Sequence, residues 1–166
     1  ATISDGDIST LALIEGTGNA LTITVTDSIV AAAELNILES KTTVNIEAID
    51  INTITGTAAD LIAAYTAKEA GTITFSTDEA ITVNDSITVA QFNYLAAATT
   101  GVITATISEG DMATLDGIAE SGNALAITVT DEVVVAVELN TLDSKTTTDL
   151  TVASSTITGS ASDLIT

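Results

Sequence analysis

The chain has 166 residues, of which 46% are hydrophobic and only 2% aromatic, so any core must be built mainly from Ala, Val, Ile and Leu. Three lysines face 23 Asp and Glu residues, and the resulting formal charge of −20 argues against nucleic acid and anionic membrane surfaces as partners. His, Cys and Arg are absent, which removes the usual general base, disulfides, thiolate metal sites and phosphate clamps.

The chain contains an internal repeat. Residues 20–43 return almost intact as residues 124–147, a shift of 104 positions. Repeats of this kind indicate an architecture in which similar units pack on one another. The sequence also starts at Ala1 and ends in a segment whose earlier counterpart continues, so we expect a piece of a longer array.

A shorter period lies inside the long one. One column of large apolar residues recurs every 23 to 31 positions, and a second apolar column follows it by three residues, as on one face of a helix. The first column comprises Leu11, Leu35, Leu61, Phe92, Leu115, Leu139 and Leu164. It divides the single expected domain, residues 1–166, into about seven coils: 1–19, 20–43, 44–71, 72–101, 102–123, 124–147 and 148–166.

Each coil begins with a strand pattern. In the second coil, Leu21, Ile23 and Val25 alternate with threonines, which is typical of a strand with one buried face. A short second extended piece follows a polar corner. The coils 44–71 and 72–101 carry extra residues, and there we expect a longer second strand or a bulge.

A short helix closes each coil. The sequences at 57–60, 88–91 and 160–163 place a Thr or Ser three residues before an Asp or Gln, which is the pattern of a helix cap. Gly18, Gly71, Gly101 and Gly122 fall near expected helix ends, where a left-handed residue is favoured.

The fold class predicted from these units is α/β, a repeat solenoid of stacked parallel strands and short helices. The leucine-rich-repeat consensus is not met. An all-β solenoid, or β-helix, is the alternative because the helical segments are short.

Calcium is the one cofactor for which the sequence offers candidate ligands. Asp5, Asp7, Glu109 and Asp111 place paired carboxylates around a glycine at matching corners, and calcium favours clustered oxygens. Known calcium-loop motifs are absent, however, and Asp is also a common turn former and helix cap. We therefore name these residues as metal candidates and expect the capping role to apply.

Two further columns have a functional and a structural interpretation. Threonines at 2, 24, 74, 106 and 128 could form an outward row of the ice-binding kind, which Glu47 is expected to interrupt. Asparagines at 36, 93 and 140 could bond to carbonyls along the stack. We expect both columns to be structural. No nucleophile–base arrangement is present, and without Trp there is no sugar platform, so an enzyme, even a carbohydrate-active one, is not expected.

The text of the coils, such as LTITVTDSIVAAAELNILESKTTV and NTITGTAADLIAAY, resembles tandem repeats of very large, acidic, Thr- and Ala-rich bacterial surface and secreted proteins, notably cyanobacterial ones. The resemblance covers essentially the whole chain. It implies an extracellular or cell-surface setting and a stalk, adhesin or surface-layer role, and it brings no catalytic residues.

The sequence thus predicts a structural tandem-repeat module, a spacer, stalk or surface-layer segment of a large extracellular protein. The alternative is a binding module, an adhesin or ice binder that uses the Thr face, with or without calcium. Expected partners are neighbouring repeats of the same chain, together with end-to-end self-association, because no polar capping unit is visible at either end. No apolar run approaches the ~18 residues of a membrane helix, so no membrane insertion is expected.

Overall fold

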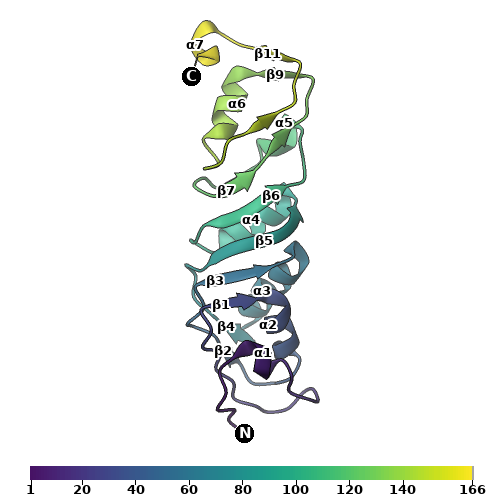
Figure 1. Cartoon of the computed structure of the whole chain (residues 1–166), viewed down its shortest axis with the longest axis vertical. Coiled ribbons are helices and arrows are strands. Elements are labelled where there is room, and N and C mark those ends of the chain that lie inside the picture. Colours follow the sequence, from purple (N-terminus) through teal and green to yellow (C-terminus); the bar gives the residue numbers. More distant parts are fainter. Residues whose placement is uncertain (166) are drawn as a thin grey trace.

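The computed structural model describes residues 1–165 and shows a mixed α/β fold whose elements succeed one another along the long axis (Figure 1). The strands are β1 (Ile29–Ala31), β2 (Ile46–Glu47), β3 (Thr53–Gly56), β4 (Ile73–Thr74), β5 (Ala80–Ile87), β6 (Ile103–Ile107), β7 (Ala124–Ala126), β8 (Thr128–Val129), β9 (Val133–Val135), β10 (Thr151–Val152) and β11 (Thr156–Thr158). The helices are α1 (Ile8–Leu11), α2 (Ala32–Glu39), α3 (Ala58–Ala70), α4 (Val89–Ala98), α5 (Met112–Leu115), α6 (Ala136–Asp143) and α7 (Ala161–Leu164). The helices exclude the all-β alternative.

Every pair of strands in these sheets is parallel. The largest sheet has five strands in the order β1-β3-β5-β6-β7, and three two-stranded sheets join β2 to β4, β8 to β10 and β9 to β11. Paired residues lie between 20 and 27 positions apart, as in Thr104↔Ala124 and Ile46↔Ile73. The predicted parallel pairing is therefore confirmed, and its spacing follows the period of the apolar column.

The apolar column forms the centre of the core. Six of its seven members are buried in one hydrophobic cluster: Leu11, Leu35, Leu61, Phe92, Leu115 and Leu139. Leu164 is the exception, since it lies in the last helix and is exposed. Val and Ile side chains on the inner faces of the strands complete the cluster, so the core consists almost wholly of aliphatic side chains, as the composition requires.

The predicted caps begin their helices. Thr57 Oγ1 accepts from Asp60 N, Ser160 Oγ accepts from Asp163 N, and Thr88 with Gln91 forms a complete capping box. At the other end of α3, Gly71 is left-handed with φ 74°, as predicted. Gly101 has a different role: a Cβ there would overlap the carbonyl oxygen of Glu79, so this glycine permits a close backbone approach.

The extra residues of the expected coils 44–71 and 72–101 lengthen their elements. β5 is the longest strand in residues 1–165, which confirms the longer second strand expected there, and its pairing with β6 shifts register between Thr82 and Ser86. α3 and α4 have 13 and 10 residues, against four in α1 and α5. Neighbouring helices therefore differ in length.

Thr166, which ends the last expected coil, lies outside the described residues. Within residues 1–165, none of the helices is both long enough and apolar enough to span a membrane.

Candidate functional site

Carboxylates at the polar corners cap helices that precede them in the chain. Asp27 accepts from the N–H of Ile8, Asp85 from that of Ala58, Asp131 from that of Met112, and Glu109 from that of Val89, each over 2.6 to 3.3 Å. Each of these N–H groups belongs to the first residue of its helix and has no partner inside the helix. The negative charge also faces the positive end of the helix dipole. These four acidic side chains therefore stabilise the first turns of helices.

The candidates Asp7 and Asp111 cap their own helices. Asp7 Oδ1 accepts from the Ser9 and Thr10 hydroxyls and from Thr10 N, and these bonds hold the pKa of Asp7 below its usual value. Thr114 donates in the same way to Asp111 and lowers its pKa. Both carboxylates are therefore held in the ionised form by the residues that follow them.

Asp5 and Glu109, the other two calcium candidates, are also engaged. Asp5 Oδ1 accepts from the N–H of Asp7 at 3.0 Å, and Glu109 contacts the Ser108 hydroxyl as well as the N–H of Val89. In residues 1–165, no group of three or more acidic side chains is arranged to hold a metal ion. The structure thus places all four candidates in turn and cap positions.

The threonines predicted to form one outward row do not all lie beside one another. Glu47 lies between Thr24 and Thr74, as the sequence indicated. Thr106 lies between Ser86 and Ala126, so a second interruption follows. The row is also divided between sheets, because Thr74 lies in β4, which pairs with β2, whereas Thr106 lies in β6, which pairs with β5 and β7.

The Asn column links successive helical segments through their side chains. Asn36 Nδ2 donates to Asp60 O at 3.0 Å, and Asn140 Nδ2 donates to Asp163 O at the same distance. Asn93 makes two such bonds: it donates to Gly117 O at 2.8 Å and accepts from Ala119 N at 3.0 Å. These amides satisfy backbone groups across a gap of 23 to 26 residues, which is the structural interpretation of the column.

A polar cluster that the sequence analysis missed is buried beside α3. Tyr65 Oη donates to Glu79 Oε1, and Lys68 Nζ lies 3.6 Å from the same oxygen. Glu79 is fully enclosed, and its Oε2 has no hydrogen-bond partner in the described part of the chain. Phe75 packs edge-on against Tyr65 and under the Lys68 ammonium group. The scarcity of lysine in the sequence is the signal that could have drawn attention to Lys68.

Burial and the bond to Glu79 raise the pKa of Tyr65 well above its usual value. The phenol therefore stays protonated and donates to the carboxylate, while Lys68 balances the charge of Glu79. The cluster joins α3 to the start of β5. It is a buried ion pair with one added hydrogen bond, and nothing in it forms a nucleophile–base pair.

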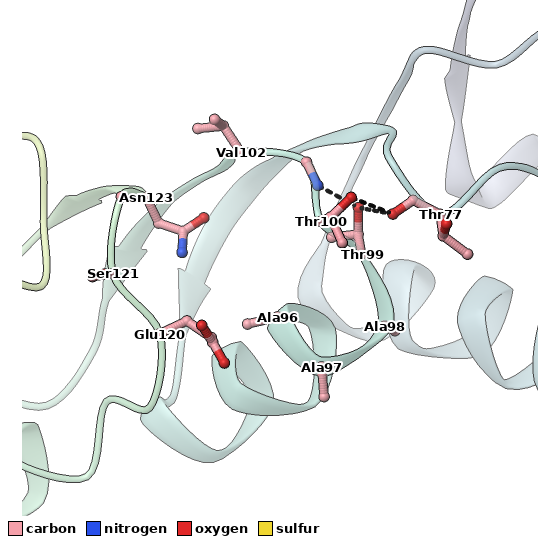
Figure 2. A pocket seen from close by; sticks show the side chains of 12 residues that line it. Thr77, Ala96, Ala97, Ala98, Thr99, Thr100, Val102, Glu120, Ser121 and Asn123 are labelled. Carbon is pink, nitrogen blue, oxygen red and sulfur yellow. Dashed lines mark hydrogen bonds between the residues drawn. The ribbon is translucent and has the colours of Figure 1, made fainter.

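A groove of about 520 Å³ lies between the end of α4, the turn at residues 99–102 and the turn at residues 120–123 (Figure 2). Asn93 bonds to Gly117 O and Ala119 N, and the groove begins directly beyond this contact, at Glu120. Ala96 and Ala98 line one side, and Glu120 and Asn123 lie across from them (Figure 2).

The groove is lined mainly by small and uncharged polar residues. Among the described residues that line it, Glu120 is the one ionisable side chain. The side-chain oxygen of Asn123 accepts a hydrogen bond of 2.8 Å from the backbone N–H of Ile103. The arrangement can accept and donate hydrogen bonds to a small polar ligand. It contains no residue pair for proton transfer or covalent catalysis.

Comparisons with known proteins found no match: no family model, no curated protein and no solved structure is similar to this chain.

Proposed function

We propose that the chain is a solenoid of about seven coils and acts as a structural module, a spacer, stalk or surface-layer segment of a large extracellular bacterial protein without catalytic activity. One observation carries the proposal: parallel pairs continue through the molecule at a spacing of 20 to 27 residues, while the same apolar column stays buried from Leu11 to Leu139. Units that share a core in this way can extend a chain by adding coils.

The charge supports a setting outside the cell. A net charge of −20 keeps an aliphatic-rich protein soluble and separates it from other anionic surfaces. The similarity in composition to acidic, Thr-rich bacterial surface proteins supports the same location. Antibody labelling of intact producing cells tests it: the proposal predicts staining before permeabilisation, and staining only after permeabilisation contradicts it.

The length of the molecule tests the spacer role. Inserting a second copy of residues 20–123 after Asn123 adds one full 104-residue period in register. Four added layers at the spacing of neighbouring strands lengthen a solenoid by about 19 Å. Small-angle X-ray scattering should show this increase in the maximum dimension with an unchanged cross-section. A thicker or spherical particle contradicts the solenoid.

Copies of the chain are also proposed to associate end to end. The last layer exposes Val152, Ile157 and Leu164, which gives an apolar surface for such contacts. Because each copy carries a charge of −20, association should increase with salt. Sedimentation at rising protein and salt concentrations tests this, and a strict monomer under all conditions contradicts it.

A further inference from the structure

The groove at the end of α4 has walls that are fixed by hydrogen bonds. Thr100 donates to Thr77 O through its backbone N–H at 2.7 Å and through its hydroxyl at 3.1 Å. On the opposite wall, the backbone oxygen of Asn123 accepts from Thr147 N at 2.9 Å. All the lining residues lie between positions 77 and 123, well inside the chain. A cavity with walls held in this way needs little rearrangement to receive a ligand.

Asn123 presents a free donor to this groove. The residue is only 7% exposed, and its Oδ1 accepts from Ile103 N. This bond fixes the orientation of the amide, because only the oxygen can accept from an N–H group. Nδ2 donates no hydrogen bond within residues 1–165, and in Figure 2 it points toward the space bounded by Ala96 and Glu120. A nearly buried donor of this kind calls for an acceptor on a molecule that enters the groove.

The end of α4 adds unpaired acceptors. Residues 96–98 line the groove, and their carbonyl oxygens accept no hydrogen bond from any group of residues 1–165. α3 differs in this respect, because Gly71 N donates to Lys68 O in its last turn at 3.0 Å. Free carbonyls at a helix C-terminus form the negative end of the helix dipole, where a cation is stabilised.

Glu120 supplies a full negative charge beside these carbonyls. Its carboxylate is exposed, and it forms no ion pair or hydrogen bond in the described part of the chain. Among the described lining residues there is no lysine to neutralise it. The net charge of −20 adds a negative potential that attracts cations and repels anions. The groove therefore favours a ligand that carries a positive charge and no negative one.

We propose that this groove binds a small hydroxylated primary amine with the size and chemistry of an amino sugar. The ammonium group lies between the Glu120 carboxylate and the carbonyls of residues 96–98, and a hydroxyl oxygen accepts from Asn123 Nδ2. The side chains of Ala96 and Val102 contact the carbon skeleton. The volume of about 520 Å³ lies within the range of small-molecule sites, roughly 300–1,000 Å³.

Both functional groups of the ligand are needed. A simple alkylammonium ion satisfies the acceptors and leaves Asn123 Nδ2 without a partner. A neutral sugar satisfies Nδ2 and leaves the negative charge of Glu120 unpaired. An amino acid carries the ammonium group, but its carboxylate meets the negative potential of the protein.

An NMR titration of the ¹⁵N-labelled protein with glucosamine hydrochloride tests the proposal, at constant ionic strength and at a mildly acidic pH that keeps the amine protonated. We expect saturable shifts of the backbone amides of residues 96–102 and 120–123 and of the side-chain NH₂ group of Asn123, with a millimolar dissociation constant. Glucose, which lacks the ammonium group, and ethylammonium, which lacks the hydroxyls, should each bind at least about fivefold more weakly.

Two variants assign the contacts. Glu120→Gln should weaken glucosamine binding about fivefold, the upper value for an ion pair in contact with solvent. Glu15→Gln is the matched control, because it removes the same charge at an exposed position outside the groove and should bind as the parent does. Asn123→Asp keeps an acceptor for Ile103 N and loses the donor, so the preference for glucosamine over ethylammonium should disappear.

The ligand comparison on the parent protein decides the outcome even if a variant folds poorly. The proposal is wrong if glucosamine gives no saturable shifts at tens of millimolar, or if glucose or ethylammonium binds equally well. It is also wrong if Glu15→Gln weakens binding as much as Glu120→Gln, because the general charge of the protein would then account for the effect. An unchanged preference for glucosamine in folded Asn123→Asp contradicts the role of Nδ2.

Discussion

The carboxylate of Asp85 accepts a hydrogen bond of 2.8 Å from the backbone N–H of Ala58, which lies 27 positions earlier in the chain. The bond satisfies the first free donor of α3 and places a negative charge at the positive end of that helix. Asp27, Asp131 and Glu109 make the same kind of contact with three other helices. In each case a carboxylate caps a helix that precedes it in the chain.

Replacing Asp85 with Ala should lower the free energy of unfolding by about 1 kcal/mol, the usual cost of a lost helix cap. Deuterium exchange at the Ala58 amide should become faster, because this donor would then face water. Asp50 is the matched control, since its carboxylate is exposed and forms no hydrogen bond in the described residues. If Asp50→Ala lowers the free energy of unfolding equally, the effect of Asp85→Ala comes from the change in net charge and not from the lost cap.

Leu35 belongs to the buried column and has no exposed surface. Leu35→Ala should cost about 2–5 kcal/mol, and Leu35→Asp should unfold the adjoining layers, because a carboxylate would enter an aliphatic core. Leu13→Ala is the control, since Leu13 is 77% exposed and should change stability by less than about 0.5 kcal/mol. Chemical denaturation measures both variants. A Leu35→Ala variant as stable as the parent would show that the column is not a core.

Tyr65→Phe should remove about 1–3 kcal/mol at neutral pH, because Glu79 loses its hydroxyl donor inside the protein. The raised pKa of Tyr65 also makes the stability of the protein depend on pH in the alkaline range. The hydrogen bond from the protonated phenol stabilises the folded state fully below the unfolded-state tyrosine pKa of about 10. This stabilisation is lost as the pH rises above that value.

The variant should therefore lose less stability than the parent on going to alkaline pH. Tyr94→Phe is the control, because Tyr94 Oη has one contact, with Thr66 Oγ1 at 3.3 Å. If the stability curves of the parent and Tyr65→Phe stay parallel above pH ~10, the buried phenol does not titrate as proposed.

Calcium should have no specific effect on this chain. The carboxylates of Asp5, Asp7, Glu109 and Asp111 already accept hydrogen bonds from the backbone and from hydroxyls. We therefore expect the same melting temperature with EDTA, and with calcium or magnesium at equal ionic strength. A rise with calcium alone that disappears in Asp7→Asn would restore these residues as ligands.

The sequence was sufficient for the mixed α/β class and the parallel strand pairing because its signals are local and repeated. The caps at Thr57, Thr88 and Ser160 each begin a helix, whereas the Thr alternation around Ile23 and Val25 forms only isolated parallel bridges, at Thr22 and Thr24. Similar neighbours that follow one another in the same direction favour parallel pairing. The irregularity in β5 could also be expected, because the extra residues of the expected coil 72–101 require a longer strand or a bulge.

The sites were harder to foresee because they depend on contacts between layers. Nothing near Glu79 indicates that Tyr65 and Lys68 converge on it, since that contact depends on how α3 packs against the start of β5. The groove near Glu120 is formed by the end of α4 and two turns that are distant in the sequence, at residues 99–102 and 120–123, so it appears only in the folded chain. The threonine row failed for a related reason, because β6 with Thr106 pairs with β5 and not with β4, the strand that holds Thr74.

The register of the stack can be measured directly with cysteine pairs, since the natural chain has none. Glu47 pairs with Thr74, and Thr128 pairs with Thr151, at exposed positions of neighbouring parallel strands. Neighbouring strands are about 5 Å apart, within the Cα separation that a disulfide spans, whereas an offset of two residues exceeds about 7 Å.

Mild oxidation of the double variants Glu47→Cys/Thr74→Cys and Thr128→Cys/Thr151→Cys should therefore give intramolecular disulfides in high yield, read by mass spectrometry of the unreduced protein. The offset pair Thr128→Cys/Ala153→Cys should stay reduced under the same conditions. Crosslinking in both registered pairs with none in the offset pair is the result that stacked parallel layers predict. Crosslinking that ignores the register, or appears only in the offset pair, would contradict the layered architecture and the spacer role built on it.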